Sequence, residues 1–297
     1  FDASQGVYGR WFAGAECNTC WNAVDRHVAT RGDQAAIIYD SPVTGAKKKI
    51  SYRELRDDVA ALAAVIKAQG VTKGDRVIIY MPMIPEAVVT MLAIARLGAV
   101  HSVVFGGFSA DSLRSRIDDA EAKVVVTADG GWRKGKVFAL KPTVDAAIEE
   151  DGGAASITNV LVVRRGENEV AWKEGRDIWW HDAMAAAEAE HVAQGFPAEQ
   201  PLFILYTSGT TGTPKGILHT SGGYLTQAAY THKNVFDIKP ETDVYWCTAD
   251  VGWITGHTYV IYGPLANGAT QLMYEGTPDA PHPGRWWELI EKIGRAS

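Results

Sequence analysis

The chain has 297 residues, a formal net charge of −6 at pH 7 and a pI of about 5.8. This acidic balance argues against nucleic acid or an anionic membrane surface as the main partner. Hydrophobic residues make up 46% of the chain, yet no apolar run approaches the roughly 20 residues that span a bilayer. The length allows one large α/β domain or two ordinary domains.

Two helices are marked clearly by their ends. Ser51 and Glu54 form the pattern of a capping box, and the apolar residues after them predict a helix that ends at Gly70. Pro85 suits the first turn of the next helix, which is expected to stop at Gly98. The run of lysines at 47–49 is interpreted as a solvated turn.

Apolar runs alternate with helical segments along the rest of the chain. Buried strands are predicted at 36–39, 76–80, 100–105, 123–127, 160–163, 202–206, 244–247 and 271–274. Further helices are predicted near 110–120, 139–150, 180–190, 222–234 and 285–293. This alternation predicts an α/β fold with parallel sheets covered by helices, in one domain or in two subdomains wound closely together.

Three cysteines are too few for a disulfide framework. Cys17 and Cys20 form a lone Cys-x-x-Cys pair, and a zinc site would need two more ligands than this pair supplies. We therefore expect reduced, packed thiols, which fits a cytoplasmic location.

Residues 206–216 read Tyr-Thr-Ser-Gly-Thr-Thr-Gly-Thr-Pro-Lys-Gly and directly follow the apolar run 202–205. A loop of this composition after a buried strand presents backbone N–H groups, hydroxyl donors and one lysine together, which suits the phosphates of a nucleotide. Its spacing matches neither the Walker pattern nor Gly-x-Gly-x-x-Gly. A flexible polar surface loop is the alternative. The candidate phosphate-binding residues are Thr207, Ser208, Gly209, Thr210, Thr211, Gly212, Lys215 and Gly216.

This stretch resembles the phosphate loop of the AMP-forming acyl-CoA synthetases, a branch of the adenylate-forming superfamily. Several other segments resemble the acetyl-CoA synthetase branch, namely 130–136, 179–182, 248–257, 262–265 and 268–270. Within the first hundred residues, 22–27 and 39–45 look closer to the propionyl-CoA synthetase branch. The resemblance covers nearly the whole chain.

The resemblance implies a reaction in two steps. A carboxylate, acetate or propionate, attacks the α-phosphorus of ATP to give an acyl-adenylate and pyrophosphate, and the thiol of CoA then attacks the activated carbonyl. ATP, Mg²⁺ and CoA are thus implied, with Thr210, Thr211 and Lys215 in catalytic roles through their hold on the leaving pyrophosphate.

Members of this family continue well beyond the equivalent of residue 297, with the main carboxylate ligand of Mg²⁺ and a mobile C-terminal domain. Residues 1–297 are therefore interpreted as part of the N-terminal AMP-binding domain, with no metal ligand set of their own. We expect the isolated chain to be unable to complete catalysis. The oligomeric state is not indicated by the sequence.

Residues 253–257 resemble the segment that lines the short acyl pocket. Bulky Trp253 and Ile254 would leave room for only a methyl or ethyl group, and Thr255 matches the acetate branch and would also lie near the pantetheine arm of CoA. The alternative is that Trp253, Ile254 and Tyr259 are core residues. His257 is interpreted as a packing histidine rather than a catalytic group.

A cluster of cations at 133–136 precedes a predicted helix and corresponds to the family's CoA-contacting segment. A solvated charge cluster at a helix start is the alternative. Asp279 stands where the acetate branch has an asparagine that touches CoA. The lone acid Asp250 is interpreted as structural. The candidate CoA-binding residues are Arg133, Lys134, Gly135, Lys136, Thr255 and Asp279.

Two other functions stay open at this point. A carboxylate kinase that forms an acyl phosphate and ADP would share the phosphate loop but not the CoA segment. A scaffold that binds nucleotide or CoA without catalysis is the non-enzymatic alternative.

Overall fold

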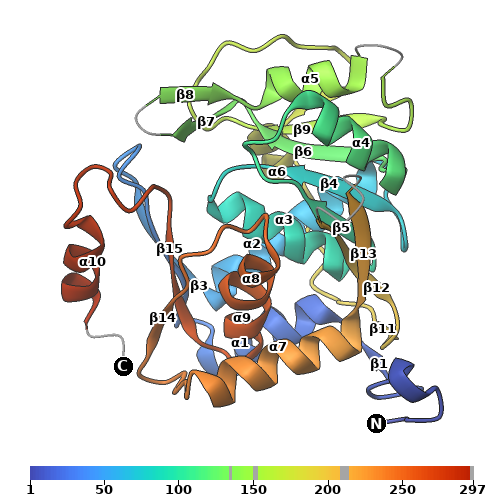
Figure 1. The fold of residues 1–297 in the computed structure, drawn as a ribbon, viewed down its shortest axis with the longest axis vertical. Helices are drawn as coiled ribbons and strands as arrows, with labels where there is room; N and C mark the ends of the chain where they lie inside the picture. Colours follow the sequence, from blue (N-terminus) through green and yellow to red (C-terminus); the bar gives the residue numbers. More distant parts are fainter. Residues whose placement is uncertain (134–135, 150–152, 208–213, 295–297) are drawn as a thin grey trace.

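The computed structural model describes residues 1–133, 136–149, 153–207 and 214–294, and Figure 1 shows two sheets with helices between them. The larger sheet has seven strands, in the order β10 (Asp177–Trp179), β9 (Asn159–Val163), β6 (Val124–Ala128), β4 (Arg76–Tyr80), β5 (Val100–Val103), β12 (Pro201–Thr207) and β13 (Lys215–Thr220). The smaller sheet has four, in the order β14 (Val244–Trp246), β15 (Thr270–Tyr274), β2 (Ala35–Asp40) and β3 (Lys47–Ser51). The α/β fold of mostly parallel sheets with helices is thus confirmed.

Helices cover both sheets. The helices are α1 (Arg26–Arg31), α2 (Tyr52–Ala68), α3 (Pro85–Arg96), α4 (Ala110–Ala120), α5 (Lys141–Glu149), α6 (Trp180–Ala185), α7 (Ser221–Val235), α8 (Ile254–Gly256), α9 (Gly263–Ala266) and α10 (Arg285–Ile293). In Figure 1, α2, α3 and α9 lie between the two sheets, α4 and α5 cover the far side of the larger sheet, and α10 lies outside the smaller one. The remaining elements are the short helical stretches η1 (Gly6–Tyr8), η2 (Trp21–Asp25) and η4 (His257–Tyr262), the paired strands β1 (Glu16–Cys17) and β11 (Phe196–Pro197), and the hairpin β7 (Gly130–Arg133) and β8 (Lys136–Ala139).

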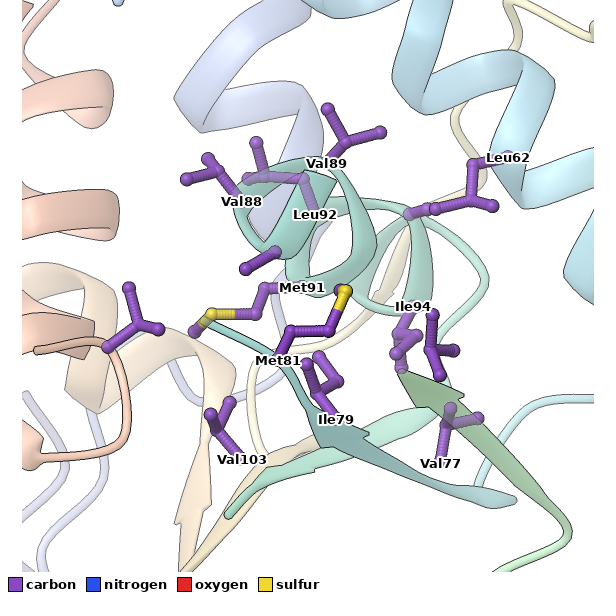
Figure 2. Close-up of a cluster of buried hydrophobic side chains, with 14 of the residues drawn as sticks. Leu62, Val77, Ile79, Met81, Val88, Val89, Met91, Leu92, Ile94 and Val103 are labelled. Carbon is purple, nitrogen blue, oxygen red and sulfur yellow. The ribbon is translucent and has the colours of Figure 1, made fainter. Parts of the chain in front are cut away.

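The core lies where α3 is enclosed by the larger sheet and by α2. Every residue of α3 except Glu86 is buried, which is the pattern of a helix surrounded by protein. Figure 2 shows Met91 and Ile94 of α3 facing Val77 and Ile79 of β4. Burial of each such side chain stabilises the fold by about 1.5–3 kcal/mol, so this layer fixes the strands whose ends carry the site.

The predicted ends of α2 and α3 are confirmed. The side chain of Ser51 accepts a hydrogen bond from the Glu54 N–H at 3.2 Å, and the Glu54 carboxylate accepts one from the Ser51 N–H at 2.7 Å. Gly70 adopts a φ of +80° just beyond α2, in the left-handed region where glycine is favoured. Pro85 is the first residue of α3.

Some sequence-based interpretations were wrong in detail. Lys47–Lys49 are exposed as expected but form strand β3, because they pair antiparallel with β2 instead of turning. Strand β13 was not predicted and is also antiparallel, so each sheet has an antiparallel strand at one edge. The helix predicted over 180–190 ends at Ala185.

Cys17, Cys20 and Cys247 are free thiols. Burial raises the pKa of the Cys20 thiol to about 12. Among the helices of the described residues, none is both long and apolar enough to cross a membrane.

Candidate active site

The candidate phosphate loop joins two antiparallel strands at the edge of the larger sheet. Strand β12 ends at Thr207 and strand β13 begins at Lys215, and these two residues are register partners. The two ends of the loop are therefore held side by side at the carboxyl end of β12. The predicted loop residues Ser208, Gly209, Thr210, Thr211 and Gly212 lie outside the described residues.

Gly216 has a packing reason to be glycine. It pairs with Tyr206 across the two strands, and a Cβ at this position would lie 2.9 Å from Cγ2 of Ile204 and 3.2 Å from the Tyr206 ring. The Tyr206 hydroxyl in turn donates to Asp119 at 2.6 Å. The structure thus explains Gly216 by strand packing, and its predicted contact with phosphate stays a prediction.

A cavity of about 690 Å³ opens at the carboxyl ends of strands from both sheets. Its lining comes from segments that directly follow β4, β5, β2 and β15, together with the β7–β8 hairpin and the start of α5. Ligands of α/β proteins bind at such strand ends. The lining residues are Pro42, Val43, Tyr80, Met81, Pro82, Met83, Phe105, Gly106, Gly107, Phe108, Trp132, Phe138, Ala139, Thr143, Asp250, Glu275, Gly276, Thr277, Ala280 and Pro281. We call this the large cavity.

Two carboxyl groups, those of Asp250 and Glu275, border the large cavity, and neither residue was predicted to belong to a binding site. Burial raises the pKa of Asp250, whose Oδ1 accepts a hydrogen bond from the Gly252 N–H at 2.7 Å. Its structural interpretation was therefore incomplete, because Asp250 also lines the cavity. Glu275 directly follows β15 and is only 4% exposed. An acid at the end of a fully buried strand was the signal that could have found it.

The segment at 253–255 lies between two cavities. Trp253 is 50% exposed and Ile254 is 41% exposed, which contradicts the alternative that they are core residues. The Trp253 ring centroid is 5.8 Å from that of Phe105, which lines the large cavity. Ile254 and Thr255 line a smaller cavity of about 410 Å³ on the other side, together with His219, Tyr224, Gln227, Thr258 and Tyr259.

His257 belongs to the core and not to either cavity. It is fully buried, its Nδ1 lies 3.0 Å from the Trp253 carbonyl oxygen, and its ring stacks on His101 at 5.5 Å. Burial lowers the pKa of His257 to about 4, so the ring is neutral at pH 7. This core position agrees with the interpretation of His257 as a packing histidine, although its Nε2 has no hydrogen-bond partner among the described residues. That His257 has no catalytic role stays a prediction.

The candidate CoA-binding segments lie in the separate β7–β8 hairpin and in the loop that follows β15 of the smaller sheet. Arg133 and Lys136 stand at the tip of the β7–β8 hairpin, whereas helix α5 begins at Lys141, so the cluster does not lie at a helix start. Whether these cations are solvated or bind CoA stays a prediction. Lys134 and Gly135 lie outside the described residues.

The neighbouring hairpin residues Trp132 and Phe138 line the large cavity. On the other side, Asp279 stands in the loop between β15 and α10, where Thr277 and Ala280 line it. Thr255 is separate, because it lines the smaller cavity.

Within the described ranges, no three His, Cys, Asp or Glu side chains form a group that could hold a metal ion. The expectation that residues 1–297 lack a metal ligand set of their own stays a prediction.

The family described as AMP-binding enzyme matches residues 24–295. The acetyl-coenzyme A synthetase of Streptomyces avermitilis is 61% identical over 294 residues, which are 99% of this chain and 44% of that protein.

The acetyl-coenzyme A synthetase of Streptomyces coelicolor is 60% identical, again covering 99% of this chain and 44% of that protein. Acetyl-coenzyme A synthetase 2 of Pseudomonas aeruginosa is 56% identical over 282 residues, which are 95% of this chain and 43% of that protein. The chain thus spans a little under half the length of these relatives. Since the family match extends over most of its residues, the chain belongs to the AMP-binding enzyme family.

Proposed function

We propose that this chain is part of an AMP-forming acetate–CoA ligase, which makes acetyl-AMP from acetate and ATP and then acetyl-CoA. The observation that carries the proposal is the arrangement along β13. This strand begins at Lys215, beside the candidate phosphate loop, and continues to His219, which lines the smaller cavity with Ile254 and Thr255. Four residues of extended strand span about 13 Å, so one strand joins the end of the candidate phosphate loop to the smaller cavity.

In this proposal the smaller cavity receives the acyl group, and Lys215 with the loop hydroxyls orients the leaving pyrophosphate. The carboxylate oxygen forms a bond to the α-phosphorus as the bond to pyrophosphate breaks. Positioning and neutralisation of charge are the main contributions that a protein makes to such a step. Mg²⁺, when bound with ATP, neutralises phosphate charge.

The large cavity is proposed to take the pantetheine arm of CoA. Its walls are mostly apolar, and Trp132 and Phe138 of the β7–β8 hairpin belong to them. The hairpin also carries Arg133 and Lys136, and we propose that these cations bind the phosphates of CoA. Trp253 lies between this cavity and the smaller one, so a thiol that reaches the 253–255 segment would approach the activated acyl group.

The test of this function is acetate-dependent exchange of pyrophosphate into ATP, measured in a protein of the relatives' length that carries this chain. Lys215→Ala and Gly209→Leu are expected to abolish exchange. Lys239→Ala is the matched control, because Lys239 is an exposed lysine whose ammonium group pairs only locally, with Asp237. Unchanged exchange in Lys215→Ala and Gly209→Leu would refute the loop assignment.

Propionate is the alternative substrate, because one methylene group is discriminated by only about 1–3 kcal/mol. Comparison of kcat/KM for the two acids decides between them. If the longer protein bound ATP or CoA but showed no exchange activity, the non-catalytic scaffold would be the better description. We place the protein in the cytoplasm, in line with its free thiols, and interpret residues 1–297 as part of an N-terminal AMP-binding domain.

A further inference from the structure

An ion pair crosses between the two sheets beside the large cavity. Arg165 follows β9 of the larger sheet, and its guanidinium pairs with Oε2 of Glu275, which follows β15 of the smaller sheet. The Tyr39 hydroxyl donates to the same carboxylate oxygen at 2.5 Å, and the guanidinium also lies 3.4 Å from the Ser41 hydroxyl. Glu275 itself lines the cavity.

The larger-sheet end of this pair is fixed to the hairpin that carries the candidate CoA cations. The Asp129 carboxylate is 2% exposed and accepts hydrogen bonds from the backbone N–H groups of Gly130, at the start of β7, and of Arg165, both at 2.8 Å. It also accepts from Gly166 and Asn168. The hairpin base and the Arg165 loop are thus held by one buried carboxylate.

The smaller-sheet end is fixed to the other wall. The Glu275 N–H donates to the Asp40 carbonyl at 3.0 Å, and the Asp40 carboxylate accepts from Arg285 of α10. Glu275 is followed directly by Gly276 and Thr277, which line the cavity ahead of Asp279. The contacts therefore run continuously from one candidate CoA segment to the other, through Arg165 and Glu275.

Stability alone is a poor explanation for this pair. Its side chains are only 11% and 5% exposed, and a buried ion pair is often no more stabilising than well-packed apolar residues. Moreover, among the described residues, neither Arg165 Nε nor Glu275 Oε1 has a hydrogen-bond partner. A buried pair between two cavity walls in which one atom of each side chain lacks a hydrogen-bond partner is better explained by the geometry that it maintains.

We propose that Arg165 and Glu275 are positioning residues that set the separation of the two walls of the large cavity, and thereby the affinity for CoA. This inference rests on the proposed entry of CoA into that cavity. It does not involve the phosphate loop or the smaller cavity. The second half-reaction is therefore sensitive to the pair, whereas the first is not.

The experiment uses a protein of the relatives' length that carries this chain, with the double variant Arg165→Met/Glu275→Met. Removing both charges leaves no unpaired buried charge, so the double variant is expected to fold. Either single variant would leave one buried charge without its partner and is expected to be strongly destabilised. The readouts are KM for CoA, the acetate-dependent pyrophosphate exchange rate, and unfolding in urea. Arg164→Met is the matched control, since its ion pair with Asp182 is 46% and 65% exposed.

We expect the double variant to raise KM for CoA at least tenfold and to change the exchange rate less than twofold, with the control unchanged in both. A KM for CoA within twofold of the original would overturn the positioning role. An equal fall in exchange and CoA use would also overturn it, because the pair would then support the whole fold. Failure of the proposed function can be told apart from failure of the positioning role, because the unmutated protein itself would then show no exchange or no use of CoA.

Discussion

Replacement of Asp129 by alanine tests whether the wall of the large cavity depends on one buried carboxylate. Four backbone N–H groups donate to this side chain, from Gly130, Arg165, Gly166 and Asn168, at 2.8–3.2 Å. Alanine removes both acceptor oxygens at once and leaves these donors without their partner.

The expected loss is large because the acceptor is charged and buried. Hydrogen bonds to charged groups contribute about 1.5–3 kcal/mol each, and the less buried donors recover part of this from water. We therefore expect Asp129→Ala to lower the free energy of unfolding by about 3–6 kcal/mol. Asp129→Asn retains one acceptor oxygen but turns an amide group toward the remaining N–H donors, so its loss is expected to be about 1–3 kcal/mol.

The assay is urea unfolding followed by tryptophan fluorescence and circular dichroism at pH 7.5. Asp182→Ala is the control, because its pair with Arg164 is exposed and a surface pair contributes about 0–1 kcal/mol. If Asp129→Ala unfolded within 1 kcal/mol of the original protein, the carboxylate would not be what holds the hairpin base, and the reasoning would be refuted.

Three further predictions concern the framework around the site. Ser51→Ala removes the capping box of α2 and should cost about 1 kcal/mol in urea unfolding, whereas no measurable change would contradict the cap. Burial lowers the pKa values of His232 and His257 to about 4, so these side chains bind protons more readily in the unfolded chain than in the folded one. Their neutral forms contribute their full stabilisation above about pH 6.5, and the free energy of unfolding falls as the pH drops toward 4. The loss is about 1.4 kcal/mol for each unit by which a pKa is shifted. His232→Phe should lose less stability than the original between pH 7.5 and 5, and an equal loss would contradict this cause. Cys20 should react with a thiol reagent only after unfolding, since burial raises its pKa to about 12, and rapid labelling of the native protein would disprove its burial.

The fold was predictable where local pattern and tertiary environment agree. Strands such as β6 are buried at every position, and their sequences are nearly continuous apolar runs. Helix α2 begins with its own capping box, and helix α3 begins at a proline. The antiparallel edge strands β3 and β13 were not predicted. Three lysines in β3 have poor strand propensity, and only the pairing with β2 makes them a strand. Strand β13 was missed because its exposed Ile217 and Leu218 follow a proline, a lysine and a glycine.

The candidate site was predictable in part. The phosphate loop and the 253–255 segment are continuous motifs, so their residue types suffice to suggest a role. The large cavity has no such motif, because it is assembled from short segments between Pro42 and Pro281 that meet only at the strand ends. Asp250 and Glu275 are isolated charges in the sequence, and Arg165 lies in a polar stretch directly after Arg164. How these residues lie relative to one another depends on the packing of two sheets.

We propose that the protein transfers an adenylate, and not a phosphoryl group, to the acid. ³¹P NMR of a reaction mixture with ATP, acetate and CoA, catalysed by a protein of the relatives' length that carries this chain, identifies the products directly. We predict AMP and pyrophosphate in equal amounts, formed only when acetate is present. Formation of ADP with an acyl phosphate would contradict the account and indicate a carboxylate kinase.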